Sequence, residues 1–365
     1  MKRSSVVTLV FLLLSALGWY YSGIGPVFLC NEVLTRFIRD AVLVLALLIP
    51  IAAGMGINFA ITVGAMSAQV GFLTAIIMNI WGLAGLSVTL LVTLVAAIVT
   101  GWLVGLILNR VKGKEMITTI IIGFLANGLY QFVYLVGYGT FIPAFNQEIL
   151  LSRGIGVRNM VDLAGYRNLM ENIWMIEVGD IHIPLFMIMV VLLFCVVVAY
   201  IMNTRFGQRV RAVGQDMEKA AALGIDVNKT RLQAIILSTV LAGLGQILYL
   251  QNIGMINVYT AHMNSDIFSA AALLAGGATL KEARVRNVIL GIFLFHTLFI
   301  VSPQAGQNLL GNAALGEYFR SFVAYGTIAL ALVFNETSQN IRGNKLCRIR
   351  NLFRKNKGPG VEPSI

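Results

Sequence analysis

Residues 86–108 read LSVTLLVTLVAAIVTGWLVGLIL, a run of 23 residues without one charged side chain. Because a bilayer core requires about 20 apolar residues per helix, this run predicts a transmembrane helix. Comparable runs recur on both sides of it. We expect ten spans, at residues 6–21, 41–57, 59–80, 86–108, 117–137, 183–202, 232–252, 266–280, 287–302 and 318–335.

The composition agrees with a membrane protein. Of the 365 residues, 58% are hydrophobic and 12% are charged, which is more apolar surface than a soluble domain of this length can bury. We predict an all-α integral membrane protein with a transmembrane domain over residues 1–340 and a basic tail over residues 341–365. In a soluble protein the net charge of +11 would suggest nucleic-acid binding. In a membrane protein it reports topology instead, and we expect lipid rather than nucleic acid as the partner.

The basic residues are distributed unevenly between the two sides. If the N-terminus is cytosolic, the cytosolic segments carry 21 Lys and Arg and the outer segments carry 6. Because cytosolic loops are enriched in these residues, we expect both termini in the cytosol and an even number of spans. The tail either lies on anionic headgroups or is a disordered stop-transfer segment. The first run has the length of a signal-peptide core, but Trp19-Tyr20-Tyr21 is more typical of an interfacial anchor.

Two loops are longer than turns. Residues 138–181 are expected outside, where they could cover the outer mouth or meet an external partner. Residues 203–231 are expected in the cytosol, and within them Asp216 to Leu223 predicts a short helix, because acidic residues suit a helix N-terminus and three alanines favour helix. Gly224 offers a C-terminal stop. Such a helix either docks into a groove of another protein or lies on the membrane surface as a connector.

Five short motifs follow one another from this loop into the next span: Arg205-Phe206-Gly207, Arg211-Ala212-Val213-Gly214, Glu218-Lys219-Ala220-Ala221, Gly224-Ile225-Asp226-Val227 and Leu241-Ala242-Gly243-Leu244. Together they resemble the coupling loop and following helix of bacterial ABC importer permeases for simple sugars, nucleosides or branched-chain amino acids. The resemblance implies that the short helix sits in a cleft of an ATPase subunit. That coupling role would fall on Arg211, Gln215, Glu218, Ala221 and Gly224.

Further segments carry the same resemblance. The small-residue stretch from Asp266 to Gly277 is similar to a family segment that ends in a glycine pair. Ile61-Thr62-Val63-Gly64-Ala65-Met66 resembles the sugar branch, and Ile57-Asn58-Phe59-Ala60 resembles the amino-acid branch. Ala60 stands where the sugar branch usually has an acidic residue, and Lys281-Glu282-Ala283-Arg284 replaces a glycine-rich loop. These departures leave the solute class open.

The resemblance implies a set of partners in a bacterial cytoplasmic (inner) membrane. They are one or more ATP-binding cassette ATPase subunits that carry ATP and Mg, a second permease that is identical or homologous, and an extracytoplasmic solute-binding protein. This chain itself is expected to bind no cofactor. It has no Walker-type phosphate loop, because Gly113-Lys114 lacks the earlier glycine and the following Ser or Thr. Cys30, Cys195 and Cys347 have no metal-binding or redox spacing, so we expect no metal site, and we find no catalytic residue set.

The spans contain few ionisable groups, whereas gradient-driven carriers usually hold such groups at membrane depth. His296 is the exception, and we expect it to be a hydrogen-bonded packing residue. The driving force should therefore come from a partner ATPase, and the alternative is a stand-alone carrier or channel. Breaks at Gly54-Met55-Gly56 and Gly276-Gly277 mark pathway candidates, because non-helical backbone at membrane depth must face protein or water. We predict that the pathway includes Asn58, Thr62, Asn127 and Ser269, although such residues can equally join helices by hydrogen bonds.

Overall fold

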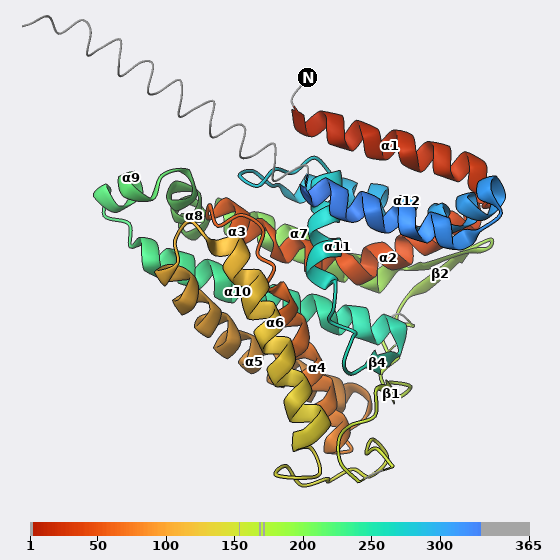
Figure 1. The fold of residues 1–365 in the computed structure, drawn as a ribbon, viewed down its shortest axis with the longest axis horizontal. Helices are drawn as coiled ribbons and strands as arrows, with labels where there is room; N and C mark the ends of the chain where they lie inside the picture. Colours follow the sequence, from red (N-terminus) through yellow and green to blue (C-terminus); the bar gives the residue numbers. More distant parts are fainter. Residues whose placement is uncertain (1–2, 153, 168, 171, 330–365) are drawn as a thin grey trace, which may run out of the picture.

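A computed structural model describes residues 3–329, apart from 153, 168 and 171. The described chain is mainly helical (Figure 1). Its helices are α1 (Arg3–Ser22), α2 (Pro26–Ala46), α3 (Leu48–Ala52), α4 (Ile61–Ile77), α5 (Gly82–Arg110), α6 (Glu115–Phe132), α7 (Leu185–Asn203), α8 (Arg205–Gln215), α9 (Met217–Ala222), α10 (Val227–Ile253), α11 (Ser265–Ala275) and α12 (Val285–Leu310). Residues 313–329 form a further helical segment, and the predicted tail at 341–365 lies outside the described residues.

Five of the described helices are long and apolar enough to cross a membrane: α5, α6 with its extension to Gly137, α7, α10 and α12. Three shorter apolar helical segments, Val7–Ser22, Ile61–Ile77 and Ser265–Ala275, accompany them. Most of the apolar surface of α5, α6 and α7 is exposed, whereas most of α10 and α12 is buried. The exposed leucines, isoleucines and valines of the first three are therefore suited to contact lipid.

Helix α10 lies at the centre of the fold and packs against α2, α4 and α5. Small residues permit this packing, because they let two backbones approach closely. Gly64 of α4 lies against the backbone of Thr239 and the side chain of Ala242, and Gly243 of α10 lies against Thr93 of α5. This close-packed centre supports the loop over residues 203–231 at one end and a cavity along one side.

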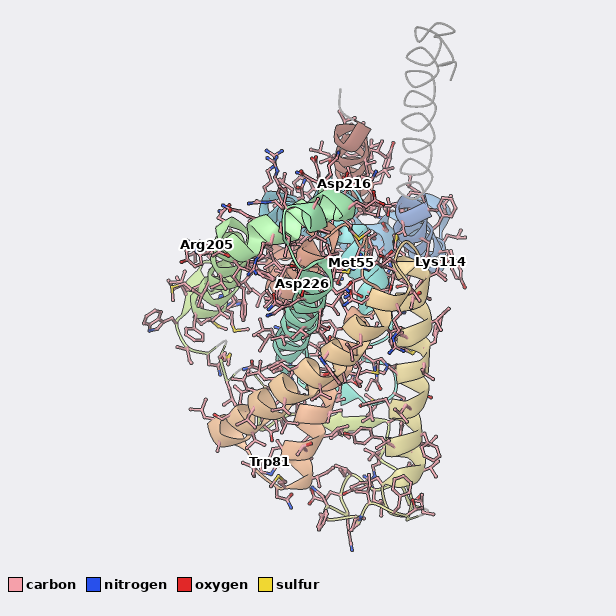
Figure 2. The ribbon with its side chains drawn as sticks, turned by 90° about the vertical axis from the view of Figure 1, so that its left-hand side faces the viewer. Met55, Trp81, Lys114, Arg205, Asp216 and Asp226 are labelled. Atoms are coloured by element: carbon pink, nitrogen blue, oxygen red, sulfur yellow. The ribbon has the colours of Figure 1, made fainter. Side chains whose placement is uncertain are left out.

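Loops of the chain gather at two opposite ends of the molecule. At one end, Gly54 meets Gly214, and Asn109 donates to the Asn228 carbonyl at 2.9 Å. Figure 2 shows Met55, Lys114 and Asp216 near this end and Trp81 at the opposite one. At that opposite end, the Asn146 amide donates to the Ile76 carbonyl at 3.1 Å. The two ends are thus built from the two sets of loops that the charge distribution separates.

The expectation of an all-α fold is incomplete. Two antiparallel two-stranded sheets occur among the described residues, one pairing β1 (Met160–Asp162) with β4 (Met255–Asn257), the other pairing β2 (Met175–Val178) with β3 (Ile181–Pro184). The segment 138–181 is folded onto the helices, with the Tyr166 hydroxyl donating to the Ile80 carbonyl and its ring against Trp81. The sequence analysis missed these strands because they are only three or four residues long.

The second expected span, at residues 41–57, is also wrong in its bounds. Helix α2 begins at Pro26, and the helical path ends at Ala52, before Gly54. The sequence suggested an outer loop over α2 up to residue 40 because this part carries the charged residues Glu32, Arg36, Arg39 and Asp40.

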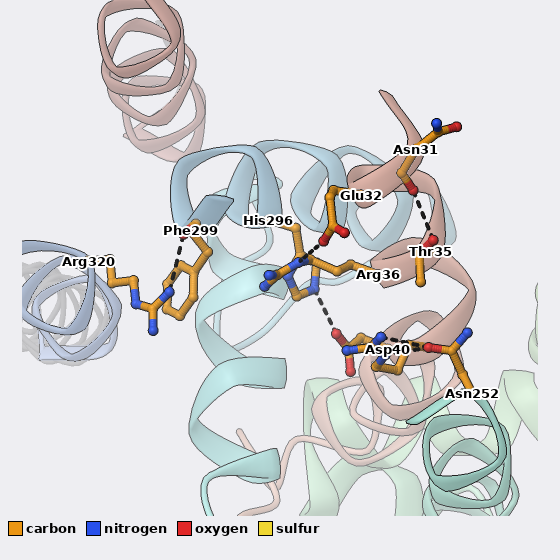
Figure 3. A network of polar contacts seen from close by, with 10 residues as sticks. Asn31, Glu32, Thr35, Arg36, Asp40, Asn252, His296, Phe299 and Arg320 are labelled. Atoms are coloured by element: carbon orange, nitrogen blue, oxygen red, sulfur yellow. Dashed lines mark hydrogen bonds and ion pairs between the residues drawn. The ribbon is translucent and has the colours of Figure 1, made fainter. Parts of the chain in front are cut away.

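Two of these charges have partners on neighbouring helices, and the other two pair with each other within α2 (Figure 3). The Asp40 carboxylate lies 3.0 Å from His296 Nε2 in α12, and the Arg39 guanidinium donates to the Asn252 amide oxygen at 2.6 Å. Glu32 pairs with Arg36 across one helical turn at 3.7 Å. His296 is hydrogen-bonded as expected, but its partner is an acidic residue. The expectation of almost no ionisable groups in the spans stays a prediction, because α2 is not among the five described helices that are long and apolar enough to cross a membrane.

Candidate functional site

The predicted short helix is present as α9. Asp216 caps its N-terminus, with the carboxylate accepting hydrogen bonds from the backbone N–H groups of Glu218 and Lys219, both at 3.1 Å. These bonds to the backbone N–H of Lys219 and the nearby Lys219 ammonium lower the pKa of Asp216. The carboxylate therefore remains ionised at neutral pH, and the cap weakens only as the pH falls through that lowered value. After Leu223, Gly224 adopts φ +80°, a left-handed conformation that suits glycine.

One face of α9 packs against the rest of the chain, and the other face is exposed. Ala220 is buried, whereas Leu223 is 79% exposed. The five residues predicted to contact an ATPase, Arg211, Gln215, Glu218, Ala221 and Gly224, are all exposed along α8 and α9. We call this exposed surface the α8–α9 platform. The structure thus brings the predicted coupling residues together on one surface.

A buried arginine joins α9 to the helices next to it. Arg231, 1% exposed in α10, places its guanidinium 2.6 Å from the Glu115 carboxylate of α6. The same guanidinium lies 3.3 Å from Met217 Sδ of α9 and 3.3 Å from the Leu108 carbonyl of α5. The sequence suggested that Arg231 is a basic loop residue, whereas in the structure it contacts α5, α6 and α9 from α10.

A second attachment joins α8 to the break after α3. Gly54, at φ +75°, packs against the backbone of Gly214 so closely that a Cβ at either position would overlap the opposite chain. We expect Gly214→Ala to separate α8 from α3 and to reduce transport activity by about tenfold or more, because the neighbouring atoms are backbone that cannot move aside.

Gly179→Ala, in the turn between β2 and β3, is the matched control for this prediction. A Cβ at Gly179, which has φ +62°, would meet nothing within 4 Å, so only the left-handed strain of about 1 kcal/mol applies. Uptake and detergent stability of both variants should be compared. Equal behaviour of the two alanines would show that the contact between Gly54 and Gly214 is not required.

A cavity with a volume of about 1030 Å³ extends along α6. It begins near Gly54, Lys114 and Lys281, at the end that carries the platform, and reaches Asn127 and His262. Its walls are largely apolar, formed by residues that include Met55, Phe59, Met116, Ile120, Phe124, Ile267 and Leu280. Its size is that of a small-molecule site.

Two of the four predicted pathway residues, Thr62 and Asn127, line this cavity. The other two do not. Asn58 is buried, with its amide oxygen accepting from the Ala60 N–H at 3.1 Å and its amide nitrogen 3.4 Å from the Ser238 hydroxyl. Ser269 is buried within α11, away from the lining. The structure therefore brings Thr62 and Asn127 together and leaves Asn58 and Ser269 among packed helices.

His262 lies at the end of the cavity opposite the platform, and it was not among the predicted site residues. Its ring nitrogens are 3.1 Å from the Gln69 amide oxygen and 2.8 Å from the Asn127 amide oxygen. It was overlooked because it stands between two expected spans rather than inside one. The signal that could have found it is Gln69, since a glutamine in the middle of an apolar helix needs a polar partner.

Comparison with known proteins now identifies the family. A family model described as the permease component of the branched-chain amino acid transport system matches residues 29–332. The chain belongs to this family. With its five long apolar helices, this permease-family chain is a multi-pass membrane protein.

Several curated permeases are similar to the chain. A nucleoside ABC transporter permease protein of Lactococcus lactis subsp. cremoris is 36% identical over 103 residues, which cover 28% of this chain and 32% of the relative. A high-affinity branched-chain amino acid permease protein of Escherichia coli is 25% identical over 138 residues, covering 38% and 40%. An autoinducer 2 import system permease protein of Photorhabdus laumondii is 26% identical over 301 residues, covering 80% and 78%. The first two matches thus span less than half of those relatives' length. No solved structure matches the chain.

Proposed function

We propose that the chain is the membrane subunit of an ATP-driven importer and forms the pathway for a small polar solute. The observation that carries this proposal is the physical connection between two features. The exposed α8–α9 platform suits an ATPase partner, and the pair between Arg231 and Glu115 links it to a cavity-lining helix, since Glu115 itself lines the cavity. In this arrangement the chain hydrolyses no ATP, and the energy enters through the platform.

The proposed assembly contains ATP-binding cassette ATPase subunits, a second permease and an extracytoplasmic solute-binding protein in the bacterial inner membrane. We propose ten crossings, with both termini cytosolic and the platform on the cytosolic side. The ten crossing segments are α1, α2 with α3, α4, α5, α6, α7, α10, α11, α12 and the helix over residues 313–329. The excess of Lys and Arg at the platform end supports this orientation.

A simple sugar or a nucleoside fits the cavity best. Toward the end opposite the platform, the cavity wall presents the uncharged polar groups of Thr62, Asn127 and His262. The walls also include the aromatic rings of Phe59 and Phe124. Polar groups of this kind suit a neutral solute with hydroxyl or carbonyl oxygens, and aromatic rings suit a flat apolar face. Branched-chain amino acids are the second candidate, supported by the similarity to amino-acid permeases.

Reconstitution with and without the partners tests the proposal. The chain, the ATPase encoded beside it and the associated solute-binding protein should be placed in proteoliposomes, and uptake of labelled ribose, uridine and leucine should be measured. Uptake of one of them should require ATP and the ATPase, and an ionophore that collapses proton and sodium gradients should leave it unchanged. Uptake that persists without the ATPase would establish a stand-alone carrier or channel instead.

A further inference from the structure

At the end of the cavity opposite the platform lies a layer of three side chains from three separate parts of the chain. Gln69 comes from α4, Asn127 from α6 and His262 from the segment between β4 and α11. His262 joins the other two through both ring nitrogens, at 3.1 and 2.8 Å. Gln69 is fully buried and His262 is 1% exposed. We call these three residues the His262 layer.

The lining of α6 stops at this layer. Residues Met116, Ile120, Gly123 and Asn127 recur at helical spacing along the cavity. The next positions on that side, Tyr130 and Tyr134, are buried and do not line it. Tyr130 stacks edge-on against the His262 ring with the centroids 5.3 Å apart, and its other face meets Tyr134.

The protein beyond the layer shows features of a segment that changes conformation. Directly after Phe132, α6 changes into a π-helix over Val133–Gly137, and such turns are frequent at functional sites. The Tyr130 hydroxyl is buried without a hydrogen-bond partner among the described residues. An unpaired buried hydroxyl is costly, so a state in which Tyr130 gains a partner would be favoured by that bond.

The hydrogen bonds of the layer can form consistently in one arrangement. The Gln131 amide also donates to the Asn127 oxygen, at 3.2 Å, which fixes that oxygen as an acceptor. Nε2–H of a neutral His262 then donates to it, and Nδ1 accepts from Gln69 once the amide of Gln69 is rotated, since a neutral imidazole has one donor and one acceptor. The segment itself remains attached to α10, because Gln246 donates to the Ala261 carbonyl at 3.1 Å.

We propose that the His262 layer is the outer barrier of the translocation pathway, and that the pathway opens when His262 separates from Gln69 and Asn127. This inference rests on the proposed role of the cavity as a pathway. His262 is the central contact of the layer because its ring nitrogens lie against both Gln69 of α4 and Asn127 of α6, while Tyr130 packs against its ring. A solute that crosses the chain must break both contacts of the imidazole.

Labelling of a cavity cysteine tests the barrier without any transport. In the full chain with Cys30, Cys195 and Cys347 replaced by serine, Thr62→Cys places a thiol in the cavity wall. The membrane-impermeant reagent methanethiosulfonate ethylsulfonate is then added to right-side-out or inside-out vesicles. With His262 intact, the thiol should react from the cytosolic side only. With His262→Ala it should also react from outside. The outside rate should be about tenfold above the background rate measured from outside with His262 intact, because two hydrogen bonds are lost.

Two variants make the result decisive. His182→Ala removes an exposed histidine of β3 that pairs with Glu177 and should leave the labelling one-sided. Asn127→Ala removes the other partner of the imidazole and should open the barrier even if His262→Ala does not insert. Unchanged cytosolic labelling shows that each variant is folded. Outside labelling of Thr62→Cys with both His262 and Asn127 intact would overturn the barrier, as would unchanged one-sided labelling in both barrier variants. Failure of ATP-driven uptake would instead contradict only the proposed function.

Discussion

Replacing Ala221 by tryptophan, or Glu218 by lysine, should abolish uptake while leaving the chain inserted and stable. Both side chains are exposed on the α8–α9 platform, so the changes disturb no internal packing. A bulky residue or reversed charge at the centre of a docking helix typically costs about 2 to 4 kcal/mol of binding. That corresponds to a loss of about thirtyfold or more in affinity for the ATPase.

The measurements are co-purification of the ATPase and ATP-driven uptake in proteoliposomes. Ala314→Trp is the matched control, because it introduces the same side chain at an exposed alanine in the first turn of the helix over residues 313–329. That control should retain the ATPase fully. If both platform variants retain the ATPase and transport normally, the docking role assigned to α9 is wrong.

Breaking the pair between Arg231 and Glu115 should have the largest effect on stability. Arg231→Met leaves the Glu115 carboxylate buried without its charged partner. Glu115→Gln likewise leaves the Arg231 guanidinium buried without its charged partner. Removing one member of a buried pair typically costs about 3 to 5 kcal/mol. Each single variant should therefore lose most of its detergent-resistant folded fraction, measured by the thermal unfolding of purified protein.

The double variant Glu115→Leu/Arg231→Met separates stability from coupling. Because no unpaired charge remains, most of the lost stability should return. If the pair also transmits movement from α9 to α6, the stable double variant should hydrolyse ATP with its partner but transport poorly. Full recovery of uptake together with stability would mean that the pair serves the fold alone.

The parts of the structure that depend on local sequence were predictable. The short helix followed from Asp216, three alanines and Gly224, and α9 confirms it with bounds that differ by about one residue. The break at Gly54 and Gly56 is likewise present, and the exposed surface of Arg211, Gln215 and Glu218 follows from the same loop. Caps, stops and apolar runs are determined by neighbouring residues, so one sequence is sufficient to find them.

The parts that depend on distant contacts were not predictable. Nothing near Asp40 in the sequence indicates that His296 will lie beside it, so the charged part of α2 was interpreted as a loop. His262 meets Gln69 only after α4 and the segment following α10 have packed together. For the same reason Asn58 and Ser269, which stand beside glycine breaks as Thr62 does, face other helices rather than the cavity.

In the proposed ten-span arrangement, the charges of α2 would affect how the chain enters the membrane during synthesis. A charged residue near the centre of a span costs about 2.5 to 3.5 kcal/mol on insertion, and α2 carries four between Glu32 and Asp40. His296, the partner of Asp40, leaves the ribosome about 250 residues later, roughly 13 to 50 s at ordinary rates of synthesis. We therefore expect α2 to be held at the insertion machinery or at the membrane surface until α12 arrives.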